Sequence, residues 1–166
     1  MSAEVTDYEV PWYTRLLDVI WRTALFLAFQ VFVAYCAVLR PRVQGVYVAV
    51  WYEKRVLVVE NSYRPKLYFP SGGVRRGESP LAAARRELRE EVGLEIAPNR
   101  FARSFEARLD HDNMKDFVTI FEVFLDSPPT IKLDRREVIA ARFVSVNDLS
   151  AKNTAVVVSE YLRRRT

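Results

Sequence analysis

Three glutamates stand within five positions of one short segment, and their spacing is the feature of this sequence that most directly suggests chemistry. They are Glu87, Glu90 and Glu91. Positions i, i+3 and i+4 of a helix share one face, so the three carboxylates would lie side by side and repel one another. Magnesium prefers carboxylate oxygens together with water and substrate phosphate, and its binding would remove that repulsion. Arg86 lies four residues before Glu90, where it can orient a carboxylate by charge-assisted hydrogen bonds.

The segment that carries these glutamates has sequence signals for the start and the end of a helix. Ser79 can cap the first amides with its hydroxyl, and Pro80 falls where a missing N–H costs nothing. Gly93 suits the left-handed residue that often follows a helix. An apolar stripe at seven- and four-residue spacing would face the core. This stripe consists of Leu81, Leu88 and Val92.

A glycine-rich turn leads directly into the predicted helix, and its glycines allow the backbone to turn sharply and approach a ligand closely. Turn and helix together match Gly-x5-Glu-x7-Arg-Glu-U-x-Glu-Glu-x-Gly-U, where U is a bulky aliphatic residue. The glutamate pair alone would be interpreted as part of a solvated charged helix. In this register with the glycine turn, the segment resembles the Nudix box of the Nudix hydrolase superfamily. The matching residues are Gly72, Glu78, Arg86, Glu87, Leu88, Glu90, Glu91, Gly93 and Leu94.

The resemblance implies an α/β/α sandwich with a mixed sheet and a hydrolase that depends on Mg²⁺ or Mn²⁺. The implied reaction is attack of water on a diphosphate linkage in a nucleoside diphosphate joined to another moiety. Carried across by position, Glu87, Glu90 and Glu91 are the expected metal ligands, and Glu78 supports the site. The backbone carbonyl of Ser71 is a further candidate ligand. Because a pure binder need not retain these carboxylates, they favour the enzyme over the alternative, a non-catalytic Nudix-like sensor of a phosphorylated ligand.

Several residues outside the helix are candidates for proton transfer or substrate binding. Glu137 would act as an extra metal ligand or general base, or else it is a surface carboxylate beside Arg135 and Arg136. Arg64 and Lys66 precede the glycine turn and are candidates for phosphate contact. Gly72 and Gly73 would bring the backbone close to the substrate, while Tyr63 and Tyr68 either stack on a ring or pack in the core. The substrate itself is not specified by any downstream signature that we recognise.

The rest of the chain fits one catalytic domain, predicted over residues 41–166. Alternating or β-branched segments predict strands, and the last segment, 155–165, predicts a closing helix. A polar hairpin is expected over 110–116. The predicted strands cover 43–51, 55–60, 67–69, 101–109, 117–125 and 139–146.

Charge and cysteine content exclude some classes of function. The net charge is +4, but no basic stripe with interleaved aromatics predicts binding to a nucleic-acid duplex. The only cysteine, Cys36, excludes an intrachain disulfide and suits a reducing, cytoplasmic compartment. An isopentenyl-diphosphate isomerase, a different class on the same fold, needs a cysteine near its site, and Cys36 lies far upstream.

The first forty residues form a separate segment whose apolar stretch, 23–39, contains no charged residue. A helix that is apolar all round is buried in protein or in lipid. Seventeen residues reach the lower limit for spanning a bilayer. Two alternatives therefore stay open, a membrane anchor or a helix that packs on the domain or on the partner in a homodimer. If the segment spans, Arg40, Arg42, Lys54 and Arg55 would keep the domain cytoplasmic.

Overall fold

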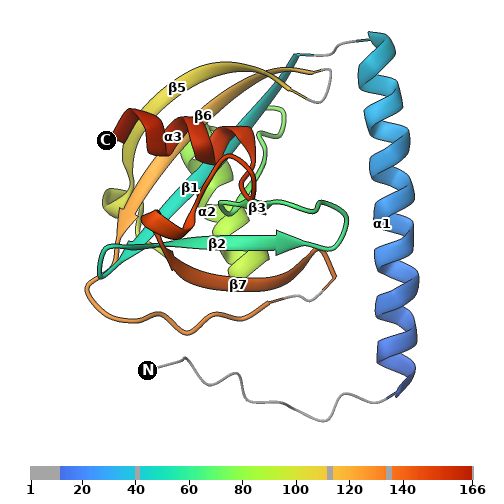
Figure 1. The fold of residues 1–166 in the computed structure, drawn as a ribbon, viewed down its shortest axis with the longest axis horizontal. Coiled ribbons are helices and arrows are strands. Elements are labelled where there is room, and N and C mark those ends of the chain that lie inside the picture. Colours follow the sequence, from blue (N-terminus) through green and yellow to red (C-terminus); the bar gives the residue numbers. More distant parts are fainter. Residues whose placement is uncertain (1–11, 40–41, 112–113, 134–135, 166) are drawn as a thin grey trace.

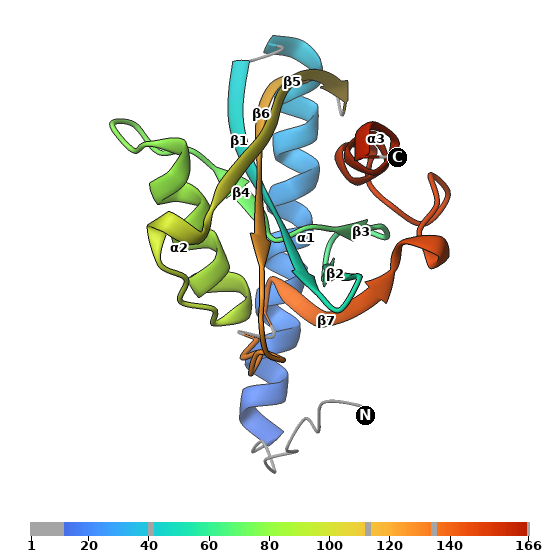
Figure 2. The ribbon, with the colours of Figure 1, turned by 90° about the vertical axis from the view of Figure 1, so that its left-hand side faces the viewer.

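The computed structural model describes residues 12–39, 42–111, 114–133 and 136–165 of the chain. A seven-stranded sheet carries helix α2 (Pro80–Val92) on one face and helix α3 (Val156–Arg165) on the other, as Figure 2 shows. The long helix α1 (Trp12–Leu39) stands beside these layers (Figure 1). The predicted α/β/α sandwich, preceded by an N-terminal helix, is therefore confirmed.

The sheet is mixed, because β1 pairs with β6 in parallel while the other pairs are antiparallel. Its central order is β3-β2-β1-β6-β5, with β4 added to β1 and β7 added to β2. Strand β1 changes partner along its length: residues 45–47 pair with β4, and residues 51–52 pair with β2. The strands are β1 (Arg42–Tyr52), β2 (Arg55–Asn61), β3 (Leu67–Tyr68), β4 (Ser71–Gly73), β5 (Ala102–His111), β6 (Met114–Phe124) and β7 (Val138–Ser145).

The core lies on both faces of the central strands. Residues 46–50 of β1 and 56–59 of β2 are all buried, and both runs are apolar throughout because helices cover the sheet on each side. On the α3 side, the buried Tyr161 holds the helix to the sheet. Its hydroxyl accepts a hydrogen bond from Trp51 Nε1 at 2.9 Å, and its ring stands edge-on to Phe69 with centroids 5.2 Å apart.

The structure corrects two local expectations. The hairpin expected over 110–116 is much tighter, because the β5–β6 ladder continues to the pair His111 and Met114. Residues 71–73, expected within a glycine turn, form strand β4 and pair with 45–47. Neither outcome has a strong local signal, since both depend on a partner strand supplied from elsewhere in the chain. Two single-turn 3₁₀ helices, Pro98–Arg100 and Val146–Asp148, complete the described elements.

Candidate active site

Helix α2 forms as its sequence predicts. The Ser79 side chain accepts a hydrogen bond from the Ala82 amide at 3.2 Å, which satisfies one of the free N–H groups of the first turn. Gly93 closes the helix in the left-handed region at φ 69°, and its amide bonds back to the last turn. Leu88 and Val92 are fully buried. These contacts fix which face of α2 is turned toward the sheet, and so where its glutamates lie.

The three glutamates of α2 are not equally exposed. The Glu90 side chain is 45% exposed and the Glu87 side chain 13%, whereas Glu91 is 6% exposed as a residue. Sharing one side of the helix therefore does not give the three carboxylates equal access to solvent, because Glu91 is buried. That residue follows Leu88 by three positions, so it shares the face that packs on the sheet. Its Oε2 accepts a hydrogen bond from the Ser71 amide at 3.0 Å, which offsets the cost of burying a carboxylate.

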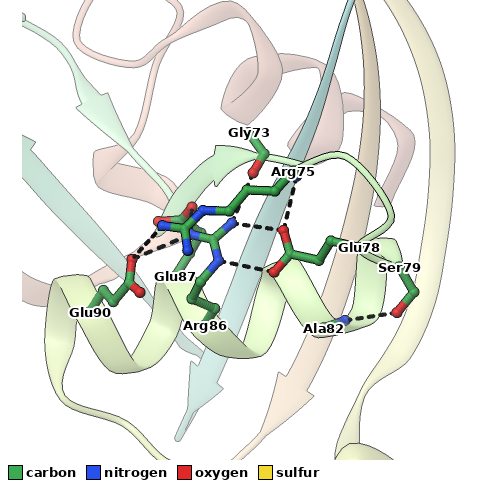
Figure 3. A network of polar contacts seen from close by, with 8 residues as sticks. All are labelled: Gly73, Arg75, Glu78, Ser79, Ala82, Arg86, Glu87 and Glu90. Carbon is green, nitrogen blue, oxygen red and sulfur yellow. Dashed lines mark hydrogen bonds and ion pairs between the residues drawn. The ribbon is translucent and has the colours of Figure 1, made fainter.

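Arg86 contacts Glu90, as expected, and several further partners (Figure 3). Its Nη1 lies 3.3 Å from Glu90 Oε2 and also pairs with Glu87. Its Nε and Nη2 each donate to Glu78 at 3.0 Å, and Nη2 also donates to the Gly73 carbonyl at 2.9 Å. The hydrogen bonds to Glu78 raise the pKa of Arg86 above its ordinary value, so the group stays charged. One guanidinium therefore joins the glycine segment to the helix carboxylates.

Glu78 holds the other end of this arrangement. Beyond its two bonds from Arg86, it accepts the Arg75 amide at 2.9 Å. The hydrogen bonds from Arg86 and then from the Arg75 backbone lower the pKa of Glu78 to about 2. The structure thus shows Glu78 fixing Arg86, while the supporting role that the sequence resemblance implies for Glu78 stays a prediction.

This pair predicts a pH dependence of stability. A carboxylate whose pKa is lowered on folding stabilises the fold above its unfolded pKa, and it loses this contribution as the pH falls through its folded value. The Glu78 contribution should therefore be complete at neutral pH, decline below about pH 4.5 and be absent near pH 2. We expect the difference in urea midpoint between wild type and Glu78→Gln to shrink over that interval. A difference that stays constant from pH 7 to pH 2 would contradict the assignment.

Gly72 provides the space in which the Glu87 carboxylate lies. A Cβ atom built on Gly72 would overlap the carboxylate of Glu87, whereas one on Gly73 would meet no heavy atom within 4 Å. Burial is the main cause that raises the pKa of Glu87, while Arg86 acts in the opposite direction. A second positive charge at this position would favour the charged form of Glu87.

The donor set suits a hard divalent cation. Carboxylates from one helix face, with the backbone of β4 opposite them, are the oxygen donors that Mg²⁺ takes together with water. The recess at Gly72, which a side chain would fill, gives the Glu87 carboxylate its place there. Within the described residues, no three acidic, histidine or cysteine side chains are close enough together to form an ion-binding group. The residues therefore fit a metal by the chemistry of their oxygen donors, while Arg86 is paired with two of the carboxylates, Glu87 and Glu90.

Glu137 is held by a tyrosine. The Tyr63 hydroxyl donates to Glu137 Oε1 at 2.5 Å, and the Ser62 amide donates to the Glu137 carbonyl at 2.8 Å. The charge of Glu137 helps to raise the pKa of Glu87, and burial followed by the charge of Glu137 raises the pKa of Tyr63. Sequence analysis missed this role of Tyr63, and no local pattern joins two residues 74 positions apart. Catalytic use of Glu137 stays a prediction.

We expect Glu137→Gln to lower the rate by about a hundredfold if Glu137 accepts the proton. Tyr63→Phe should lower kcat about tenfold with KM unchanged, because it removes a hydrogen bond to a charged group that it positions. The double variant should be no slower than Glu137→Gln alone. Tyr52→Phe is the matched control, since it removes a surface hydrogen bond of 2.9 Å from the Tyr52 hydroxyl to the Glu53 carboxylate. Rates within about twofold for Glu137→Gln would identify Glu137 as a surface carboxylate.

The two predicted phosphate contacts lie elsewhere. The Arg64 guanidinium stacks among three rings, 4.7 Å from the centroid of Phe29, 5.3 Å from Tyr63 and 5.1 Å from Tyr68. Arg64 and Lys66 line a cleft beside α1, and Glu87, Glu90 and Glu91 do not line it. Tyr63 and Tyr68 therefore pack against Arg64 inside the protein, which is the second of the two alternatives expected from the sequence. The structure brings Glu78, Glu87 and Glu90 together around Arg86, but it places Arg64 and Lys66 in a different recess.

The fold, the capped helix and the box geometry together define a class of protein, and comparison with known proteins agrees. The family model described as NUDIX domain matches residues 41–164, and the chain belongs to this family. Members of the family generally use divalent metal ions.

Individual relatives are more distant. An RNA pyrophosphohydrolase from Bartonella bacilliformis is 48% identical over 48 residues, which cover 27% of this chain and 28% of that protein. The MutT NUDIX hydrolase from Burkholderia pseudomallei has a TM-score of 0.67 at 17% identity, covering 76% of this chain and 99% of its own. The MutT protein from Methanosarcina mazei has a TM-score of 0.65 at 20% identity, covering 76% and 94%. The two solved structures support the fold alone.

Proposed function

We propose that this protein is a pyrophosphohydrolase that cleaves the diphosphate linkage of a nucleoside diphosphate joined to another moiety. The observation that carries the proposal is the network around Arg86, which ties the glycine segment to the box carboxylates Glu78, Glu87 and Glu90. A relative that is similar over the matched segment is named an RNA pyrophosphohydrolase, and this name supports the same class of bond. The substrate is expected to be a small phosphorylated molecule.

Glu87, Glu90 and Glu91, with the backbone of Ser71, are the residues that would hold Mg²⁺ or Mn²⁺. When bound, such an ion neutralises phosphate oxygens and lowers the pKa of a water. The protein's own part is orientation: Arg86 holds Glu87 and Glu90, and the Ser71 amide holds Glu91. Glu137, whose carboxylate accepts a hydrogen bond from Tyr63, is one candidate to accept the proton of the attacking water. A box glutamate is the other candidate for this proton.

The decisive experiment incubates the purified full chain with Mg²⁺ or Mn²⁺ and a panel of phosphorylated compounds. The panel contains nucleoside triphosphates, nucleotide sugars, dinucleotides and 5′-triphosphorylated RNA, and products are identified by chromatography. Cleavage of a diphosphate bond that requires the metal and is lost in Glu90→Gln would support the proposal. Saturable binding of a panel member without any product would instead favour a non-catalytic sensor of a phosphorylated ligand.

A further inference from the structure

Helix α1 has one covered stripe and a broad apolar surface without a partner in the monomer. Of the fifteen exposed large apolar side chains among the described residues, eleven lie on α1, with exposures of up to 81% at Val38. Soluble monomers rarely keep apolar patches of more than a few hundred Å² exposed. The helix is also long and apolar enough to cross a membrane, judged by length and composition. The covered stripe consists of Asp18, Arg22, Leu25, Phe29, Val33 and Cys36.

The covered stripe fixes the helix along the domain. Within the stripe, the Phe29 ring lies 5.2 Å from the Tyr63 ring and Cys36 is fully buried. Beside the stripe, the half-exposed Trp21 ring lies 5.5 Å from the Arg136 guanidinium. From Trp21 to Cys36 the helix rises by about 22 Å. A hydrocarbon core is about 30 Å thick, so a spanning helix docked in this way would draw charged parts of the domain into it. The docked helix is therefore compatible with lying along a membrane surface and not with crossing it.

A cationic cleft borders the apolar surface of α1. Phe26 of the helix lines this cleft together with Arg64, Lys66, Arg142 and Lys152. Its carboxylate, Glu60, is paired with Arg142, so cations outnumber anions. The loop that follows β2, which carries Arg64 and Lys66, reaches toward α1 in Figure 1. Basic groups beside an apolar helix surface are complementary to anionic lipid headgroups above acyl chains.

We propose that α1 and this cleft form a lipid-docking surface, with the helix lying in the plane of an anionic bilayer. The outer apolar side chains enter the acyl boundary, the cleft receives headgroup phosphates, and the covered stripe keeps the domain attached. Both sequence-based alternatives for the segment are then combined, since the helix packs on the domain and also binds lipid. Deleting it would uncover Tyr63 and Arg64, so point substitutions test the surface more cleanly than truncation.

The test is flotation of the full chain with vesicles of phosphatidylcholine alone or mixed with phosphatidylglycerol. Wild type should float with the anionic vesicles, and Val31→Glu/Val38→Glu should bind at least about tenfold more weakly. Val156→Glu changes a valine of α3 that is 49% exposed and should bind like wild type. Lys152→Glu should weaken binding to anionic vesicles about fivefold or more, whereas Lys54→Glu, in the turn between β1 and β2 at the opposite side of the domain, should not. Equal binding by wild type and the double valine variant would overturn the proposal.

Orientation and competing partners need two further measurements. In a Cys36→Ala background, Ser2→Cys on vesicle-bound protein should react fully with a membrane-impermeant maleimide, because an in-plane helix leaves both ends on one side. Protection of that cysteine would show a spanning helix and overturn the in-plane arrangement. Light scattering without lipid gives the oligomeric state. A stable dimer that is disrupted by Val31→Glu/Val38→Glu and does not bind vesicles would assign the surface to a second copy of the chain.

Discussion

Replacing Glu90 by glutamine is expected to lower the rate of diphosphate hydrolysis by about a hundredfold or more and to leave the unfolding temperature unchanged. The Glu90 side chain is 45% exposed, and its ion pairs with Arg86 and Arg75 span 3.3 and 3.6 Å. Ion pairs made by so exposed a carboxylate contribute little to stability, whereas the lost charge belongs to the proposed metal site. The measurement is kcat/KM at limiting Mg²⁺ together with thermal unfolding. Glu106→Gln, which removes the charge of another exposed, ion-paired glutamate, in β5, is the matched control.

Substitutions of the buried Glu91 test the same metal site separately from protein stability. Glu91→Gln should also lose activity, but the amide oxygen of glutamine can still accept the Ser71 N–H. Glu91→Ala removes that acceptor, and an unpaired buried amide costs about 1–3 kcal/mol. We therefore expect the alanine variant to unfold at a lower temperature than the glutamine variant at equal loss of rate. Near wild-type turnover of both Glu90→Gln and Glu91→Gln at limiting Mg²⁺ would refute the metal assignment.

Gly72→Ala is expected to have the second large effect, because the new methyl group would occupy the place of the Glu87 carboxylate. The carboxylate must move out of its recess, or the backbone of β4 must shift against β1. Overpacking of this kind typically costs about 1–3 kcal/mol. The displaced ligand should lower the rate by about a hundredfold. Thermal unfolding and kcat/KM, measured with and without Mg²⁺, report the two effects separately.

The neighbouring glycine supplies the control for stability. Gly73→Ala adds the same methyl group where no heavy atom lies within 4 Å, and it keeps the carbonyl that accepts from Arg86. Its unfolding temperature should stay close to that of wild type. If Gly72→Ala unfolds at the same temperature as Gly73→Ala and retains wild-type activity, then Glu87 does not depend on the recess at Gly72.

Local signals in the sequence were sufficient for the helix that carries the site. A serine cap, a proline in the first turn, an aliphatic stripe and a closing glycine each act within a few residues, and all were found as predicted. The same holds for the central strands, whose continuous apolar runs reflect burial on both faces. Because the box residues lie on this one helix and the turn before it, their grouping also followed from the sequence.

Only the tertiary structure decided how these groups are used. The burial of Glu91, the reach of Arg86 to Gly73 and the pairing of residues 71–73 as a strand all depend on how β4 and α2 meet. Contacts between distant segments have no local pattern that would reveal them. The bond from Tyr63 to Glu137 is one such contact, and the docking of α1 is another. By itself, the sequence determined that α1 is apolar. Only its packing against the domain decided which stripe of the helix is covered and which side chains stay exposed.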